Sequence, residues 1–576
     1  MAASVFMAGL ETAGMVSILP FMALVVDRTA LTRYPILASL ASSVGTLSWR
    51  ETVAWAAAAT ATLVTAGNIA RALANWWQWR FEARVRHRLT SDLMRAVLYA
   101  PYSLHVARDA SSLMKVVGHD VPNVTGSVLL PLLRMASGSC VVLALLGLIV
   151  LQTPLVVLAS VATIGGAYVA LFRGMRRRQL LLGEQVGRLT YEWRLTSHEA
   201  LGGIKELTVL NRREPIFARF SDADKRLADL QVRRKLTETL PRHGLETITF
   251  GCILAAMIVL TTSDATGATA AIPTLALFAF VAYRLMPRLQ ELYASALSVR
   301  YGIPSLRAVL SAWRETGVST ALQAIPDKVE PIGFQDDVCL HDVTFTYPGA
   351  TRPALTGVTL CIRRGESIGL VGRTGAGKST LADLLLGLFE PDSGSVMIDG
   401  VRLTRESQAA WRRRVGYVAQ HVFLANATVS ENIAFGLRKE DIDHDAVIEA
   451  ARLAQVDSFI ATLPHGYATV VGERGVRLSG GERQRIGIAR ALYRRPSILI
   501  FDEATSALDG LTQEAVMGAI QQLREERTVV IIAHRLRTLE ACDRLVFLEA
   551  GHVVAVGSFD ALTTSSEAFA RFRSKS

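Results

Sequence analysis

Long apolar stretches alternate with long polar ones over the first 300 residues of the chain. Several of the apolar stretches reach the roughly 20 residues that a helix needs to cross the hydrocarbon core of a bilayer. The first of them has no basic segment before it and is too long for the apolar part of a signal peptide. The pattern therefore predicts six membrane-spanning helices, at about 3–26, 53–75, 127–151, 154–172, 245–261 and 272–286.

Two of the polar stretches between these spans are long and basic. Residues 76–123 contain 7 Lys and Arg and residues 173–242 contain 16, whereas the predicted outer loop 27–51 contains 3. Basic loops stay on the cytoplasmic side of a membrane, so the N-terminus is predicted to be cytoplasmic. Both stretches are rich in helix formers. We expect them to continue the membrane helices into the cytoplasm and to turn back at about 103–118 and 198–212.

The pattern changes beyond residue 335, where short runs of β-branched residues alternate with helical segments. Residues 367–371, 497–501 and 528–533 are strand-like. Strands that alternate with helices predict an α/β domain with a largely parallel sheet. Pro326 and Pro331 lie in a mixed polar stretch before this domain, which we interpret as a linker.

The composition agrees with a membrane protein. Half of the residues are hydrophobic and 20% are charged, whereas a soluble chain is about 25% charged. The net charge of +11 is expected to reside in the cytoplasmic loops, and nucleic-acid binding is disfavoured. The cysteines show no CxxC spacing and are predicted to be small buried hydrophobes, neither bridged nor metal-bound. They are Cys140, Cys252, Cys339, Cys361 and Cys542.

A P-loop pattern, Gly-Arg-Thr-Gly-Ala-Gly-Lys-Ser-Thr, lies between a predicted strand and a predicted helix. Its small residues let backbone N–H groups surround phosphate oxygens at a helix N-terminus. Lys378 is expected to bind the β- and γ-phosphates, and Ser379 to ligate Mg²⁺. A chance glycine-rich turn is the competing interpretation, and the flanking strand and helix disfavour it. The predicted nucleotide-binding residues of this segment are Gly372, Thr374, Gly375, Gly377, Lys378, Ser379 and Thr380.

Other candidate residues follow predicted strands. Asp502 and Glu503 end an apolar strand, where the first is placed to hold Mg²⁺ and the second to polarise the attacking water. Gln420 is a candidate to sense Mg²⁺ or water. His534 is a candidate for the γ-phosphate, although a lone histidine after a strand is commonly a surface residue. Tyr347 could stack on adenine or could be a core aromatic residue.

A second phosphate site is predicted where Leu478-Ser479-Gly480-Gly481-Glu482 leads into a helical run. Two phosphate sites on one domain make sense if two domains enclose two nucleotides between them. We therefore expect a transmembrane domain at 1–310, a linker at 311–335 and a nucleotide-binding domain at 336–576.

The order and spacing of these motifs, with Ser506-Ala-Leu-Asp509 after Glu503, resemble those of ATP-binding cassette (ABC) transporters. Six spans before one cassette are similar to a type IV exporter half-transporter. The resemblance implies a homodimer with ATP and Mg²⁺ at two shared sites, each P-loop facing Ser479, Gly480, Gly481 and Glu482 of the partner. It implies nucleotide contact for Asp509, catalytic roles for Glu503, His534 and Gln420, and alternating access across the cytoplasmic membrane. Ala419 departs from the family, which usually has proline there.

The substrate is less clear from the sequence. The segments around Glu11 and residues 198–220 resemble the lipid-linked oligosaccharide flippase of bacterial protein N-glycosylation. Arg71, Arg134 and Arg284 lie in or near the spans, where charged residues usually face a cavity or a partner, and they suit a phosphate headgroup. Glu11 could pair with Arg134, and Arg71 and Arg284 could instead extend to the interface. An exporter of lipid, peptide or small hydrophobic compounds is the alternative, and an ATP-gated channel or regulatory subunit is disfavoured.

Overall fold

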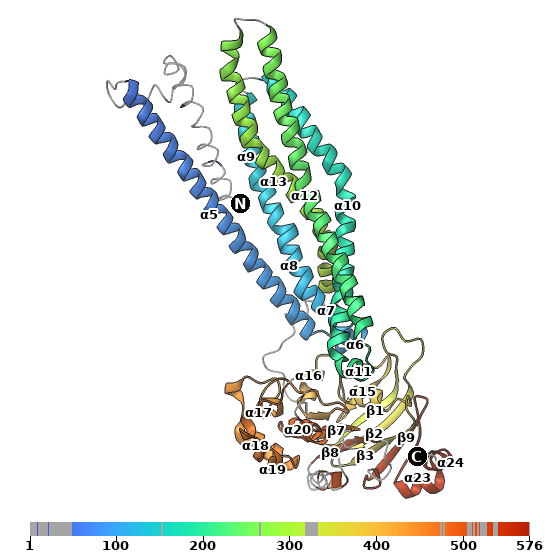
Figure 1. Cartoon of the computed structure of the whole chain (residues 1–576). Coiled ribbons are helices and arrows are strands. Elements are labelled where there is room, and N and C mark those ends of the chain that lie inside the picture. Colours follow the sequence, from blue (N-terminus) through green and yellow to red (C-terminus); the bar gives the residue numbers. More distant parts are fainter. Residues whose placement is uncertain are drawn as a thin grey trace. The chain divides into compact units, whose positions relative to one another are not determined.

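The computed structural model forms two compact units, one of residues 1–100 and 108–323 and one of residues 101–107 and 324–576 (Figure 1). It describes residues 49–150, 154–263, 267–316, 332–472, 475, 478–503, 510, 513–514, 516, 518, 527–533 and 539–574, together with Gly9 and Phe21. The first predicted span, apart from Gly9 and Phe21, and most of the predicted linker lie outside these residues, and the limits between the predicted domains stay predictions.

The first unit is helical. Its elements are α5 (Trp49–Leu98), α7 (Ala110–Lys115), α8 (Val121–Val124), α9 (Leu130–Val150), α10 (Pro154–Gly202), α11 (Ile204–Val209), α12 (Arg213–Ser263), α13 (Gly267–Glu315) and the π-helices η1 (Val116–Asp120) and η2 (Thr125–Leu129). α5, α10, α12 and α13 contain 49 to 51 residues each. At about 1.5 Å per residue, each is about 75 Å long, more than twice the hydrocarbon thickness. The predicted extensions beyond the membrane are therefore present.

Two of the described helical stretches, Trp49–Leu98 and Ser111–Ala144, are long and apolar enough to cross a membrane. The predicted spans 154–172, 245–261 and 272–286 each lie within a single helix, α10, α12 and α13 respectively. α10 packs against both α12 and α13, and α13 packs against α9. The apolar stretches among the described residues thus form a helical bundle, as predicted.

A buried polar cluster joins the π-helical segment to α13. Asp120 is 1% exposed, and its Oδ1 accepts a hydrogen bond from Ser305 at 2.9 Å. Asn123 donates to the same serine at 2.8 Å, and Lys115 lies 3.5 Å from Asp120 Oδ2. A buried carboxylate needs such partners, so this cluster fixes the packing of the two segments.

The second unit contains two sheets. The antiparallel sheet has the order β2-β1-β4-β5, and the second sheet has the order β10-β9-β3-β8-β7-β6. The second sheet is parallel except for β10, as the alternation of strands and helices predicted. The strands are β1 (Asp337–Phe345), β2 (Leu355–Arg363), β3 (Ser367–Val371), β4 (Ser393–Ile398), β5 (Val401–Arg402), β6 (Val415–Val418), β7 (Ile498–Asp502), β8 (Thr528–Ile532), β9 (Arg544–Glu549) and β10 (His552–Gly557).

Alternate side chains of the parallel strands enter two different cores. Ile498 and Ile500 of β7 belong to the core that holds the helix after the P-loop, whereas Leu499 and Phe501 belong to the core that holds α20. The P-loop helix and α20 therefore pack on opposite faces of this sheet. The described helices are α15 (Lys378–Leu385), α16 (Gln408–Arg412), α17 (Val429–Ile433), α18 (His444–Leu453), α19 (Asp457–Ala461), α20 (Gly480–Leu492), α23 (Phe559–Ser565), α24 (Glu567–Arg573) and the 3₁₀ turns η3 (Lys439–Asp441) and η4 (Gly466–Ala468).

The second unit also includes a short segment from the first half of the chain. α6 (Tyr102–Ala107) belongs to this unit, and the ring of Tyr102 packs edge-on against Phe389, with 5.5 Å between ring centroids. The sequence predicts the first turn at about 103–118. The segment that groups with the second unit is residues 101–107, which is shorter than the predicted turn and begins two residues earlier. Residues from Arg108 onward group with the helical unit.

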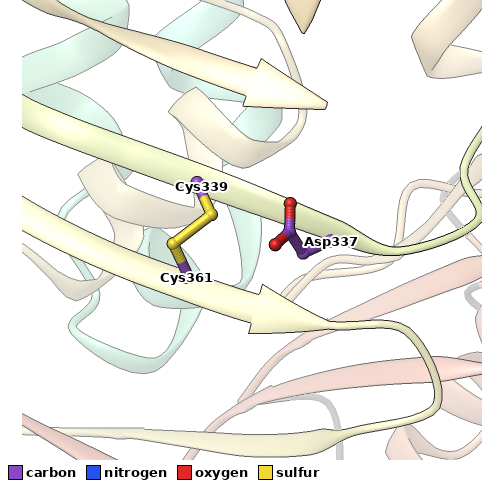
Figure 2. A group of neighbouring side chains, drawn as sticks. All are labelled: Asp337, Cys339 and Cys361. Carbon is purple, nitrogen blue, oxygen red and sulfur yellow. A yellow bond between two sulfur atoms is a disulfide. The ribbon is translucent and has the colours of Figure 1, made fainter. Parts of the chain in front are cut away.

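The prediction for two of the cysteines is wrong. Cys339 in β1 and Cys361 in β2 form a disulfide (Figure 2). The antiparallel register sets these residues directly opposite each other, with 4.1 Å between their Cα atoms. No spacing in the sequence indicates this pairing, because it depends on which residues of two strands face each other. Cys542 is buried, as predicted, and Cys140 is half-buried.

Candidate nucleotide site

The P-loop is shaped by glycines in left-handed conformations. Gly372, Gly375 and Gly377 have φ values of +157°, +81° and +100°. A Cβ atom on Gly372 would lie 2.3 Å from the carbonyl oxygen of Leu548, and one on Gly377 would lie 2.7 Å from Leu355. Neither position can accept a larger residue without a shift of the backbone. The loop therefore turns sharply from β3 into α15, as its sequence predicted.

The lysine of the loop is held inside it. Lys378 is 6% exposed, and its Nζ donates hydrogen bonds to the carbonyl oxygens of Gly372 at 2.7 Å and Arg373 at 3.0 Å. Burial lowers the pKa of Lys378, and the negative charges of Glu503 and Asp502 oppose this shift. The lysine thus lies near the carboxylates that end β7, where a phosphate could replace its carbonyl partners.

Other residues of the P-loop face solvent. Thr374, Gly375 and Ser379 are exposed, whereas Thr380 is buried. The exposed backbone of the loop and the N-terminus of α15 offer N–H groups to an anion. This segment can therefore receive phosphate without rearrangement of the core.

Three predicted residues meet at the ends of β6 and β7. Gln420 follows β6, and its Nε2 donates a hydrogen bond to Oε2 of Glu503 at 2.7 Å. Asp502 ends β7, and the Tyr417 hydroxyl of β6 is hydrogen-bonded to it. Parallel pairing of β6 with β7 brings the two loops together. Glu503 also has φ of +50°, which is unusual for a residue with a side chain and is typical of functional sites.

Tyr347 lies against the P-loop helix. Its hydroxyl is 3.2 Å from both Thr380 Oγ1 and Asp383 Oδ2, and its ring packs edge-on against Phe345 and Phe389. These contacts agree with the interpretation of a core aromatic residue. Stacking on adenine stays a prediction.

Sequence analysis missed Asp383 and Tyr417. Burial raises the pKa of Asp383 to about 6, and the hydrogen bond from Tyr347 opposes this shift. Asp383 lies one turn and a half after Lys378 on α15, and no motif marks it. Tyr417 lies between Gly416 and Val418 in the strand that leads to Gln420, and its place in this strand is the signal that sequence analysis could have used.

The second predicted phosphate site is the N-terminus of α20. Ser479 is its N-cap: the Ser479 hydroxyl accepts from the Glu482 backbone N–H at 3.3 Å. Glu482 returns a hydrogen bond, accepting from the Ser479 N–H at 2.7 Å. This reciprocal cap fixes the exposed Ser479 at the helix start, with Gly480 and Gly481 following. The carboxylate of Glu482 is thereby used to position the serine.

Several predicted residues are not placed. His534, Asp509 and Glu11 lie outside the described residues, and Arg284 lies in α13 with no described side chain. Arg71 is an exposed residue of α5, and Arg134 is a half-buried residue of α9. The arrangement of these groups around a ligand stays a prediction.

Known proteins share both halves of this arrangement. The family model for the ABC transporter transmembrane region matches residues 16–286, and the ABC transporter model matches residues 355–506. The ATP-dependent lipid A-core flippase of Thiobacillus denitrificans is 32% identical over 491 residues, which cover 83% of this chain and 82% of that protein. The chain belongs to the ABC transporter family.

Two further relatives match over shorter stretches, and a solved structure matches the whole chain. The ATP-dependent lipid A-core flippase of Escherichia coli (strain K12) is 46% identical over 226 residues, which cover 39% of each chain. That of Chromobacterium violaceum is 44% identical over 232 residues, which cover 40% of this chain and 39% of that one. The solved structure of a bacterial Atm1-family ABC exporter with ATP bound has a TM-score of 0.82 at 25% identity, covering 100% of this chain and 97% of that one.

These matches identify the unit with the P-loop as the ATP-hydrolysing cassette of a transporter. The chain is an ATP-hydrolysing membrane transporter with the fold of an ABC exporter, and ATP binds to its cassette. Half-transporters of this family typically work as dimers.

Proposed function

We propose that this ABC transporter moves a lipid with a phosphorylated glycan headgroup across the cytoplasmic membrane, using ATP. The observation that carries the proposal is the 32% identity with a flippase over 82% of that protein's length. A lipid-linked oligosaccharide, as expected from the sequence, and a lipid A-core glycolipid both belong to this chemical class. The alternative is an exporter of other lipids, peptides or small hydrophobic compounds.

The depth of Arg134 in the membrane supports a contact between its side chain and a lipid headgroup. Trp76, Trp77 and Trp79 are exposed on α5, as expected for an aromatic belt at the interface, and Arg80 lies over Trp76 at 5.3 Å. Gln78, in the middle of this belt, donates a weak hydrogen bond to Ser137 of α9 at 3.5 Å. If this belt marks the cytoplasmic interface, Ser137 lies at interface depth and α9 enters the hydrocarbon later than the predicted start of its span at 127.

Arg134 lies one turn from Ser137, on the cytoplasmic side of that depth, because α9 runs outward. A lipid phosphate in the inner leaflet lies at the same depth, so the guanidinium group of Arg134 could bind it through paired N–H donors. Arg71 lies seven residues outward from Gln78 on α5. With about 1.5 Å per residue, the two arginines are separated by about 15 Å along the membrane normal. They would contact the headgroup at successive stages of transport.

The chemistry of the cassette is proposed as follows. Gly372, Thr374, Gly375, Gly377, Lys378, Ser379 and Thr380 bind the phosphates of ATP, and Tyr347 contacts the adenine. Glu503 polarises water for attack on the γ-phosphate, held in place by Gln420, while His534 contacts that phosphate. Asp509 joins the nucleotide contacts. The oxygen donors of Ser379, Gln420 and Asp502 fit Mg²⁺, which would neutralise phosphate charge.

The proposed assembly is a homodimer with two shared ATP sites. The P-loop helix and α20 pack on opposite faces of one sheet, so Ser479 of one chain is suited to face the P-loop of another. In addition, the turn between α10 and α12 carries exposed apolar residues that suit a protein contact. These residues are Leu201, Ile204, Val209 and Leu210, with exposed fractions of 75%, 51%, 78% and 66%.

Translocation in proteoliposomes tests the proposed function. The probes are a fluorescent polyprenyl-pyrophosphate oligosaccharide and a fluorescent lipid A-core glycolipid, with Glu503→Gln as the hydrolysis-deficient control. ATP-dependent movement of either probe, lost in the control, supports the proposal and identifies the glycan class. Vigorous ATP hydrolysis without movement of either probe overturns it and favours the alternative exporter, for which other lipids and peptides would then be compared.

A further inference from the structure

The outer face of the antiparallel sheet carries two sulfur atoms and a carboxylate close together. Cys339 and Cys361 face each other across β1 and β2, and Asp337 lies two residues before Cys339, on the same face of β1. The ligand atoms of the three residues all lie within 4.8 Å of one another. Figure 2 shows the Asp337 carboxylate beside the two sulfurs.

This group is separate from the nucleotide site. Val338 and Leu340, which alternate with these residues on β1, are fully buried in the core, so the three side chains project from the opposite face. Cys339 lies near the start of β1, whereas Tyr347 follows the other end of this strand, eight residues later. None of the three is among the candidate nucleotide-binding or catalytic residues.

The compartment decides the state of the two sulfurs. An ATP-hydrolysing domain lies on the side of the membrane that contains ATP, which is the cytoplasm in the proposed function. Thiols are kept reduced there, and paired cysteines in cytosolic proteins more commonly bind metals than form structural bridges. Reduction breaks the S–S bond with two electrons from two small-molecule thiols, yielding two Cys thiols and one disulfide of the reductant.

We propose that the reduced form of this hairpin binds a thiophilic divalent cation of the zinc class through Cys339, Cys361 and Asp337. Binding replaces the two thiol protons by the metal and releases them to solvent. A tetrahedral cation with bonds of about 2.3 Å to sulfur needs the sulfurs about 3.8 Å apart, a separation that side-chain rotation across a facing pair can supply.

The surroundings favour this ligand set. Cys361 is exposed, so water can reach the fourth position, whereas Cys339 is 7% exposed and shields one side of the site. Two thiolates select zinc and cadmium over the hard cations Mg²⁺ and Ca²⁺. The cation thereby adds a link between the paired strands β1 and β2 when the disulfide is reduced.

Cadmium titration of the full-length transporter tests the site without reference to its activity. The nucleotide-free protein is reduced with a phosphine, which is then removed, and Cd²⁺ is added while thiolate-to-cadmium absorption in the ultraviolet is recorded. We expect one Cd²⁺ per chain in the reduced wild type. The oxidised wild type, with its disulfide intact, lacks this absorption and serves as a control that needs no substitution.

Variants assign the ligands. Cys361→Ser, at an exposed position that tolerates serine, removes the absorption, whereas Cys542→Ser leaves it unchanged. Asp337→Asn keeps the thiolate signal but weakens Zn²⁺ binding, measured by competition with a chromophoric chelator, by about ten-fold or more. The matched control Asp336→Asn, at the exposed neighbouring position, keeps the wild-type affinity.

Three results would overturn the proposal. They are no thiolate-to-cadmium absorption in the reduced wild type, equal absorption in Cys361→Ser, and equal absorption in the oxidised protein. Unchanged Zn²⁺ affinity in Asp337→Asn would remove the carboxylate from the site and contradict the three-residue assignment. None of these outcomes depends on which lipid the transporter moves.

Discussion

The side-chain amide of Gln420 donates a hydrogen bond to the carboxylate of Glu503, with 2.7 Å between Nε2 and Oε2. The two residues come from loops after neighbouring parallel strands. A glutamine held in this way fixes the direction of the carboxylate.

Replacement of Glu503 by Gln should separate binding from hydrolysis. The amide cannot accept a proton from water, so we expect ATP turnover to fall by about 100-fold or more. ATP binding should stay close to wild type, since the phosphates contact the P-loop. Steady-state ATPase assays and fluorescent-nucleotide titration measure the two effects. Near-normal hydrolysis would contradict the proposed role.

Replacement of Gly377 by Ala should destabilise the cassette more than the same change at Gly375. Both glycines have positive φ, which costs an alanine about 1–2 kcal/mol. A Cβ on Gly377 would also lie 2.9 Å from the Ala354 carbonyl oxygen, whereas one on Gly375 meets no heavy atom within 4 Å. Thermal unfolding without nucleotide compares them. An equal or larger loss at Gly375 would count against this account.

Shared ATP sites predict complementation between two inactive variants. Lys378→Ala breaks the P-loop, and Ser479→Arg blocks the α20 terminus, so each homodimer has two defective sites. A mixed dimer has one site with both defects and one with neither. We expect co-expressed, tandem-purified mixed dimers to regain ATPase activity above either homodimer. Activity no higher than that of the parents would argue against head-to-tail sharing.

Asp383→Asn should stabilise the protein at neutral pH. Because the pKa of Asp383 is about 6 in the folded state and 3.8 ordinarily, the folded protein binds more protons between these values. Wild-type stability therefore falls as pH rises from about 4 to 6, and the penalty is complete above pH 6.

Asparagine carries no charge and can still accept a hydrogen bond from Tyr347. With allowance for solvent screening, we expect a gain of about 1 kcal/mol at pH 7.5. The gain should shrink at pH 5. Melting temperatures of wild type and variant at the two pH values measure this, and a pH-independent difference would show that Asp383 is not the titrating group.

Arg134→Ala should raise the glycolipid concentration needed for half-maximal ATPase stimulation by about ten-fold or more, since a charge-assisted pair is lost. Basal ATPase should not change, because Arg134 lies in the helical unit. Arg71→Ala, combined with it, should act additively within about 0.5 kcal/mol if the two arginines contact the headgroup at different depths. Strong coupling between them would place both on one phosphate.

Local patterns explain why much of the cassette was predictable. The sequence predicts a strand at 367–371, and β3 has these limits. The prediction succeeds because an apolar run precedes a loop whose glycines are required by backbone geometry. Gln420 and Glu503 were each found at a strand end. Their direct contact was not foreseen, because it follows from the parallel pairing of β6 with β7.

The features that sequence analysis missed depend on packing between distant segments. The bridge between Cys339 and Cys361 needs the register of β1 and β2, which hydrophobic alternation alone does not fix. The contact of Tyr102 with Phe389 joins residues nearly 300 positions apart. The raised pKa of Asp383 arises from burial that a helical pattern does not reveal.

The backbone at Glu503 has a consequence for how this chain changes over evolutionary time. Glycine and asparagine adopt a φ of +50° more readily than glutamate. For a residue with a branched or longer side chain, this conformation costs about 1–2 kcal/mol of folding free energy. Random substitution combined with selection for folding alone would thus remove the glutamate. A lineage that no longer needs transport should lose this carboxylate early, so its persistence in a sequence is a sign of continuing use.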